Sequence, residues 1–66
     1  MKATSIINDG RISYQSNFTY PSEHDTIAHF EDYCLLHDAK WSKLFKESDG
    51  THIASYDCIN GLEVVK

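Results

Sequence analysis

The chain has 66 residues, 41% of them apolar and including one Trp, four Tyr and three Phe, which is the size of a single small domain over residues 1–66 and the composition of a folded chain. Its net charge of −4 disfavours non-specific binding to nucleic acids and anionic lipids, and no apolar run is long enough to span a membrane. The first residues, MKATSIIND, lack the pattern of a secretory signal, so we expect a cytoplasmic protein with free thiols at Cys34 and Cys58.

The segment 4–20, TSIINDGRISYQSNFTY, is typical of a β-hairpin. The Asp-Gly dipeptide at 9–10 is a strong two-residue turn signal, and a turn there puts Ile7 opposite Ile12 and Ser5 opposite Tyr14. The second strand alternates between two kinds of side chain, which predicts a sheet covered on one face only. Its predicted inner residues are Ile12, Tyr14, Ser16, Phe18 and Tyr20.

A helix is predicted to begin after Pro21, with Ser22 as its N-cap and Asp25 three residues later. At about 100° per residue, apolar side chains from Ile27 to Phe45 fall on one stripe, so we expect one helix that ends before Asp49-Gly50. The expected stripe consists of Ile27, Phe30, Tyr33, Cys34, His37, Trp41, Leu44 and Phe45.

The segment 51–66, THIASYDCINGLEVVK, reads as a second hairpin that turns at Asn60-Gly61. Such a turn pairs Ile59 with Leu62, but the alternation does not show which face lies inside. The whole order is β-β-α-β-β, and the predicted fold class is therefore α+β, with a small antiparallel sheet of two hairpins packed on one face by a single amphipathic helix. The order of the strands in the sheet is not readable from the sequence.

The segment HFEDYCLLHD, residues 29–38, is the part of the chain richest in groups that bind metals or act as nucleophiles. Cys34 and His37 lie three positions apart on the expected helix, and with Cys58 they could form part of a metal- or redox-responsive site. Both residues of the pair also lie on the apolar stripe, where a buried thiol and a hydrogen-bonded core histidine are the simpler interpretation. We therefore expect no enzyme activity, no metal and no cofactor.

With Ile27 at zero on the helical wheel, Leu35 and Leu36 fall at about 80° and 180°, away from the stripe and on the side of the helix expected to face water. Two adjacent exposed leucines indicate a contact with another protein. We predict a protein-binding surface made of His29, Asp32, Leu35 and Leu36, with Glu31 near its rim. The edge strands of the sheet offer a second route, by pairing with another chain or with a second copy as a homodimer.

Nucleic-acid binding would have to use Lys40, Lys43 and Lys46 beside Trp41, which is a small basic footprint against ten acidic residues. We therefore expect the partner to be a protein, and neither a nucleic acid nor a membrane. No motif identifies a family. In size and style only, the chain resembles accessory proteins of phages and mobile elements that inhibit a host factor, and this resemblance implies an inhibitor that acts by protein–protein binding.

Overall fold

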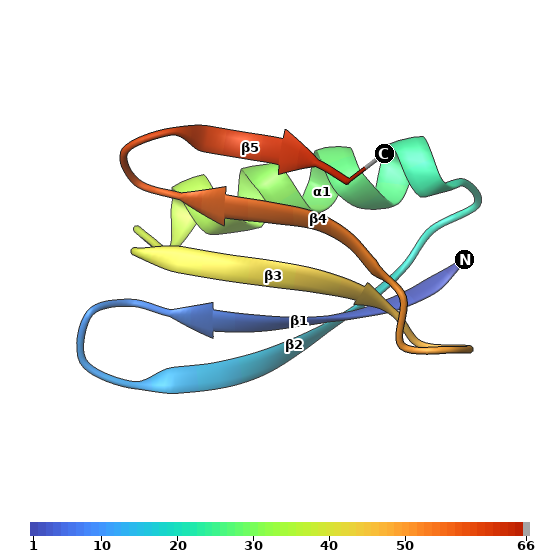
Figure 1. The fold of residues 1–66 in the computed structure, drawn as a ribbon, viewed down its shortest axis with the longest axis horizontal. Helices are drawn as coiled ribbons and strands as arrows, with labels where there is room; N and C mark the ends of the chain where they lie inside the picture. The colour runs from blue at the N-terminus through green and yellow to red at the C-terminus, as the bar shows by residue number, and fades with distance from the viewer. Residues whose placement is uncertain (66) are drawn as a thin grey trace.

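The computed structural model describes residues 1–65, which form five β-strands and one α-helix (Figure 1). In chain order the elements are β1 (Lys2–Asn8), β2 (Ser13–Thr19), α1 (Glu23–Leu36), β3 (Trp41–Lys46), β4 (His52–Asp57) and β5 (Gly61–Val64). The strands form one antiparallel sheet in the order β2-β1-β3-β4-β5. The predicted α+β class, with an antiparallel sheet and a single helix, is confirmed, and the sheet has one strand more than two hairpins supply.

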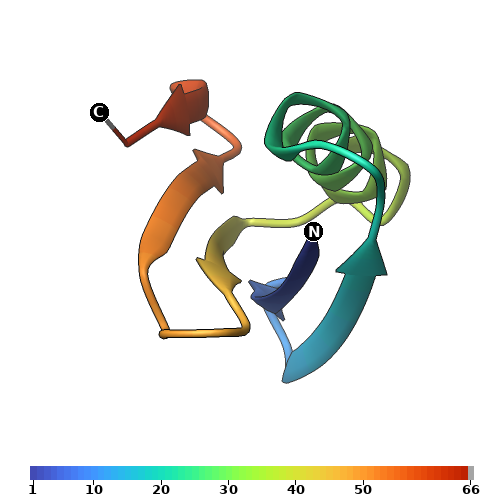
Figure 2. The same cartoon turned by 90° about the vertical axis from the view of Figure 1, so that its right-hand side faces the viewer.

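The helix packs against one face of the sheet, and the sheet curls toward it (Figure 2). Strands β2 and β5 are the two edge strands of the sheet. Between the two layers, the ring of Phe18 meets the rings of Phe30 and Tyr33 edge to face, with centroids 6.2 and 5.5 Å apart. This is a preferred geometry for aromatic pairs. The buried core consists of Ala3, Ile7, Phe18, Ile27, Phe30, Cys34, Ala39, Leu44, Ile53 and Ala54.

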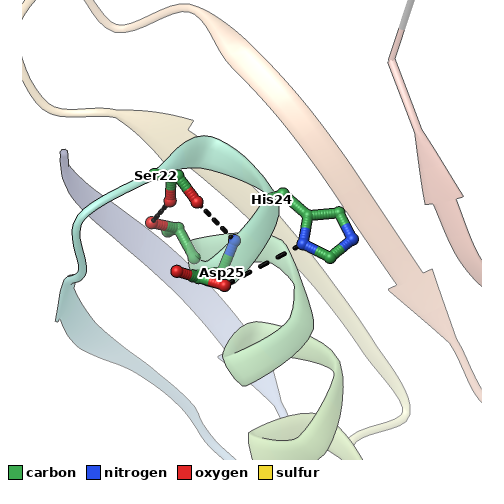
Figure 3. Close-up of polar contacts among 4 residues, drawn as sticks. Ser22, His24 and Asp25 are labelled. Carbon is green, nitrogen blue, oxygen red and sulfur yellow. Dashed lines mark hydrogen bonds and ion pairs between the residues drawn. The ribbon is translucent and has the colours of Figure 1, made fainter.

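The helix begins where the sequence predicts. Ser22 is the N-cap, and its side-chain oxygen accepts a hydrogen bond from the Asp25 N–H at 3.1 Å (Figure 3). The Ser22 carbonyl accepts from both the hydroxyl and the N–H of Thr26, at 2.7 and 3.0 Å. His24 Nδ1 lies 3.9 Å from Asp25 Oδ1 in an exposed contact.

In the part of the chain that is described, no helix has the length and apolarity needed to cross a membrane.

The prediction of one helix from Ile27 to Phe45 is wrong, because α1 ends at Leu36. His37 is the C-cap, and Asp38 adopts a left-handed conformation with φ of 51°. The Asp38 N–H donates to the Leu35 carbonyl at 3.4 Å, and the Ala39 N–H donates to the Cys34 carbonyl at 3.0 Å. These two bonds form a Schellman motif, which usually has glycine at the left-handed position. Aspartate tolerates that conformation better than most residues, so the helix ends without a glycine signal.

The residues after Ala39 that were predicted to continue the helix form strand β3 instead. It alternates: Ser42 and Leu44 are buried against the helix, while Trp41 and Lys43 are exposed on the outer face. The placement of Trp41 in the core is therefore wrong. The large apolar residues at 41, 44 and 45 fit a helical spacing, but in the strand the small polar Ser42 faces inward while the large Trp41 faces outward.

The first hairpin forms as predicted, but its register differs by two residues. Ile7 pairs with Tyr14 and not with Ile12, because the turn is longer than the Asp-Gly dipeptide. The Asp9 carboxylate accepts hydrogen bonds from the N–H groups of Arg11 and Ile12, at 2.9 and 3.0 Å, and closes this longer turn. A shift of two residues preserves the faces, so the predicted alternation in β2 is confirmed: Tyr14, Ser16 and Phe18 face the helix.

The second hairpin also forms, but the predicted pairing of Ile59 with Leu62 is wrong. Asp57 pairs with Gly61, and Tyr56 pairs with Leu62. The Asp57 carboxylate accepts from the N–H groups of Ile59 and Asn60 at 2.9 and 2.6 Å, so the turn contains residues 58–60. In β4 the neighbouring residues Ile53 and Ala54 are both buried, so burial does not follow a strict alternation; Ala54 lies opposite Leu44, next to a register shift between Leu44 and Phe45.

Candidate protein-binding surface

Three connecting segments lie side by side at one end of the molecule. The strand residues Asn8, Trp41 and Asp57 form one row across the sheet at this end. The Lys40 N–H donates to the Asn8 carbonyl at 2.7 Å, and the Cys58 N–H donates to the Lys40 carbonyl at 3.1 Å. The β1–β2 turn, the segment after α1 and the β4–β5 turn therefore meet here, at the left-hand side of Figure 1.

This end carries five of the eight large exposed hydrophobic side chains in residues 1–65. We call them the apolar end: Ile12, Leu35, Leu36, Trp41 and Ile59, with exposed fractions of 62%, 57%, 79%, 41% and 88%. They come from four separate segments of the chain. Trp41 lies on the outer face of the sheet and Leu36 on the helix that packs on the other face, so what the five side chains share is one end of the molecule. Exposed apolar side chains gathered in one region are a feature of surfaces that contact other proteins.

The predicted surface residues on α1 are divided among different sides of the helix. Leu35 and Leu36 belong to the apolar end. His29 instead stacks on the ring of Tyr20 after β2, with centroids 3.9 Å apart and planes within 5°. Glu31 lines the groove between α1 and β5. Asp32 is exposed on the helix. Their role in binding stays a prediction, but His29 and Glu31 do not share one surface.

Sequence reasoning missed three members of the apolar end. Trp41 was assigned to the core stripe of a longer helix, and Ile59 was assigned to a strand. Ile12 was expected on the inner face of β2. The positions of Ile12 and Ile59 next to predicted hairpin turns could have indicated their exposure, because a side chain in or beside such a turn lies outside the core. Ile12 follows Asp9-Gly10 closely, and Ile59 directly precedes Asn60-Gly61.

The border of the apolar end is acidic. Hydrogen bonds from backbone N–H groups of their own turns lower the pKa of Asp9 and of Asp57 below the ordinary value, because these bonds favour the charged carboxylate. The other charged residues on these segments or beside them are Asp32, Asp38, Arg11, Lys40 and Lys43, which lies next to Trp41 on the outer face. Four carboxylates and three cations therefore surround the exposed hydrophobic side chains.

The structure separates the three residues considered for metal or redox chemistry. Cys34 is fully buried between helix and sheet, whereas Cys58 is exposed in the β4–β5 turn. His37 is exposed and packs against the ring of Tyr33 at 4.2 Å, so its prediction as a core histidine is wrong, because the helix ends at this residue. Burial raises the pKa of the Cys34 thiol, against the effect of a hydrogen bond with Ser42. Over residues 1–65, no three His, Cys, Asp or Glu residues are placed to hold one metal ion.

The apolar end, its acidic border and His29 stacked on Tyr20 are the exposed features of residues 1–65 considered as a candidate site. Comparisons with known proteins assign them no role. No protein-family model matches the chain, and neither a curated protein nor a solved structure matches it.

Proposed function

We propose that this protein acts by binding another protein, and that the apolar end is its binding surface. The observation that carries the proposal is the gathering of Ile12, Leu35, Leu36, Trp41 and Ile59 at one end of the sheet. Each side chain leaves apolar area in contact with water, and covering it would release free energy of roughly 25 cal/mol per Å². Large apolar and aromatic side chains at the centre of a surface are also the residues that dominate binding energy in protein interfaces.

The charges around the apolar end indicate the chemistry of the partner. The border has more carboxylates than cations, and hydrogen bonds from their own turns lower the pKa of Asp9 and of Asp57. A partner that presents an apolar groove bordered by lysines or arginines would complement this arrangement in both respects. The proposal places the protein in the cytoplasm, where the exposed thiol of Cys58 would stay reduced.

The test replaces Leu36 and Ile59 together by lysine. Leu36 is the last residue of α1, where a cation suits the negative end of the helix dipole, and Ile59 is almost fully exposed, so the double variant should fold. The two lysines would interrupt the apolar surface and repel a basic border on the partner. The control is Val65→Lys, which changes an exposed apolar residue directly after β5, at its end away from the β4–β5 turn.

The measurement is quantitative affinity capture from the cells that express the protein, with wild type, the double variant and the control compared in parallel. We expect at least one protein that wild type and Val65→Lys capture equally and that the double variant captures at least about tenfold less, a loss of about 1.4 kcal/mol. Trp41, the one tryptophan of the chain, then reports on the purified complex through a blue shift of its emission. If all three proteins capture the same set in the same amounts, or if wild type captures none, the proposal is wrong.

A further inference from the structure

The edge strand β2 presents unused backbone hydrogen-bonding groups. It pairs with β1 on one side only, and it is the outermost element of the sheet in both views (Figures 1 and 2). The N–H of Tyr20 donates to the carbonyl of Met1, and the N–H of Asp9 donates to the carbonyl of Ile12, at 3.1 and 3.2 Å. These bonds show that even-numbered residues of this strand direct their backbone groups toward β1. By alternation, Ser13, Gln15, Asn17 and Thr19 direct theirs toward the open edge.

Nothing in β2 protects this edge from pairing with another strand. Natural proteins block exposed edges with charges, prolines, bulges or very short strands. β2 has seven residues, pairs with β1 without a register shift, and contains neither a charged residue nor a proline. It lies inside the longest uncharged segment of the chain, 12–22. The opposite edge differs: β5 has four residues, and one of them is Glu63.

The residues of β2 are chemically symmetric about Ser16. The sequence is Ser-Tyr-Gln-Ser-Asn-Phe-Thr, so the residues equidistant from the centre are two amides, two aromatics and two hydroxyls. When two copies of such a strand lie antiparallel about a two-fold axis, each residue meets the one equidistant on the other side of the centre. The pairs are then Gln15 with Asn17, Tyr14 with Phe18, and Ser13 with Thr19. Amide and aromatic pairs of this kind are favourable across strands, and no pair brings like charges together.

We propose that two copies of this protein pair through their β2 strands, antiparallel about a two-fold axis at Ser16, and so join their sheets into one. The open backbone groups match this arrangement, because the pairs of odd-numbered residues are those that exchange backbone bonds. About eight backbone hydrogen bonds would form. The proposal commits to a second copy because the strand complements itself at every position, and this self-complementarity is what an isologous interface requires.

This pairing does not rest on the apolar end, which is made of other segments. Tyr14, Ser16 and Phe18 would meet their counterparts on the face that carries the helix, and the exposed Gln15 and Asn17 would meet on the outer face. The two β1–β2 turns would point in opposite directions, so each protomer would keep its apolar end free. A dimer would thereby hold two binding surfaces of the kind proposed above.

The first test is the mass in solution of the full chain, measured by light scattering over a range of concentrations. We expect wild type to approach twice 7.6 kDa as the concentration rises to about 0.5 mM. Gln15→Lys places a lysine on the open edge, diagonally across from its symmetry mate, and should weaken the dimer at least about tenfold. The control, Ser55→Lys, puts the same charge on the outer face of the inner strand β4 and should leave the dimer unchanged.

The second test traps the register. In the dimer the two Ser16 residues face one another without backbone bonds, with Cα atoms about 4.5 Å apart, a distance that a disulfide can bridge. Ser16→Cys, made together with Cys58→Ser so that no other exposed thiol is present, should give a covalent dimer on oxidation. Ser55→Cys in the same background should not. A monomer at every concentration, a dimer that Gln15→Lys leaves intact, or equal crosslinking at both positions would overturn the proposal.

Discussion

Two buried serines on the inner face of the sheet should respond in opposite ways to the same substitution. Ser5 in β1 is fully buried, and its hydroxyl oxygen has no hydrogen-bond partner. Ser42 in β3 is 1% exposed, and its hydroxyl donates to the carbonyl of Ile6 at 2.8 Å. We therefore expect Ser5→Ala to stabilise the fold and Ser42→Ala to destabilise it.

The magnitudes follow from the difference in hydrogen bonding. An unpaired buried hydroxyl costs about 1–3 kcal/mol, so removing it from Ser5 should raise the free energy of unfolding by about 1 kcal/mol even after part of that cost is offset by lost packing. A hydrogen bond of the kind made by Ser42 contributes about 1 kcal/mol, so its loss should lower the free energy of unfolding by a similar amount. In a domain of this size, 1 kcal/mol corresponds to a change in Tm of about 7 °C.

Urea unfolding followed by circular dichroism and Trp41 fluorescence measures both changes. With an m-value of about 1 kcal/mol/M, the two midpoints should move by about 1 M in opposite directions with the slope unchanged. Protein concentration must be equal in all samples, since self-association would itself add stability. If Ser5→Ala lowers the midpoint as much as Ser42→Ala does, the hydroxyl of Ser5 has a partner and the reasoning fails.

Three further predictions concern the helix end, the turns and the thiols. Asp38→Gly should stabilise the fold by up to about 1 kcal/mol, because it removes a side chain from a left-handed residue and a negative charge from the end of α1; Asp38→Asn, which removes only the charge, should recover less in thermal melts. The depressed pKa of Asp57 means that its contribution to stability is present above about pH 4 and lost as the pH falls through its folded pKa, so Asp57→Asn should lower the stability at neutral pH and reduce the further loss below about pH 4 in urea titrations. A thiol reagent should modify Cys58 at once and Cys34 only when the fold opens, so a native protein that shows two fast thiols would contradict the burial of Cys34.

Local signals in the sequence predicted the beginnings of elements better than their ends. Ser22 after Pro21 identified the helix start, and the Asp-Gly and Asn-Gly dipeptides identified both hairpins. The end of α1 was missed because Asp38 occupies a position where glycine is the usual signal. The registers were missed because the side chains of Asp9 and Asp57 close longer turns than those dipeptides indicate.

The apolar end could be predicted only in part. Leu35 and Leu36 were recognised as exposed because their positions on the helix do not depend on the rest of the fold. The exposure of Trp41 depends on β3 being a strand in the middle of the sheet, and that order is set by contacts between distant segments. A single strand of six residues with an inward serine carries no pattern that distinguishes it from a helical continuation.

The position of β1 between β2 and β3 bears on how the chain folds. The β1–β2 hairpin and the β3-β4-β5 meander are each made of strands that are neighbours in sequence, and they can form quickly. The β1–β3 pairing joins strands separated by the whole of β2 and α1, so its formation has the largest loop-closure cost and should limit the folding rate. The hydrogen bond from Ser42 in β3 to Ile6 in β1 joins these two strands, so its loss should slow folding. Destabilising substitutions in β5 should instead mainly speed unfolding.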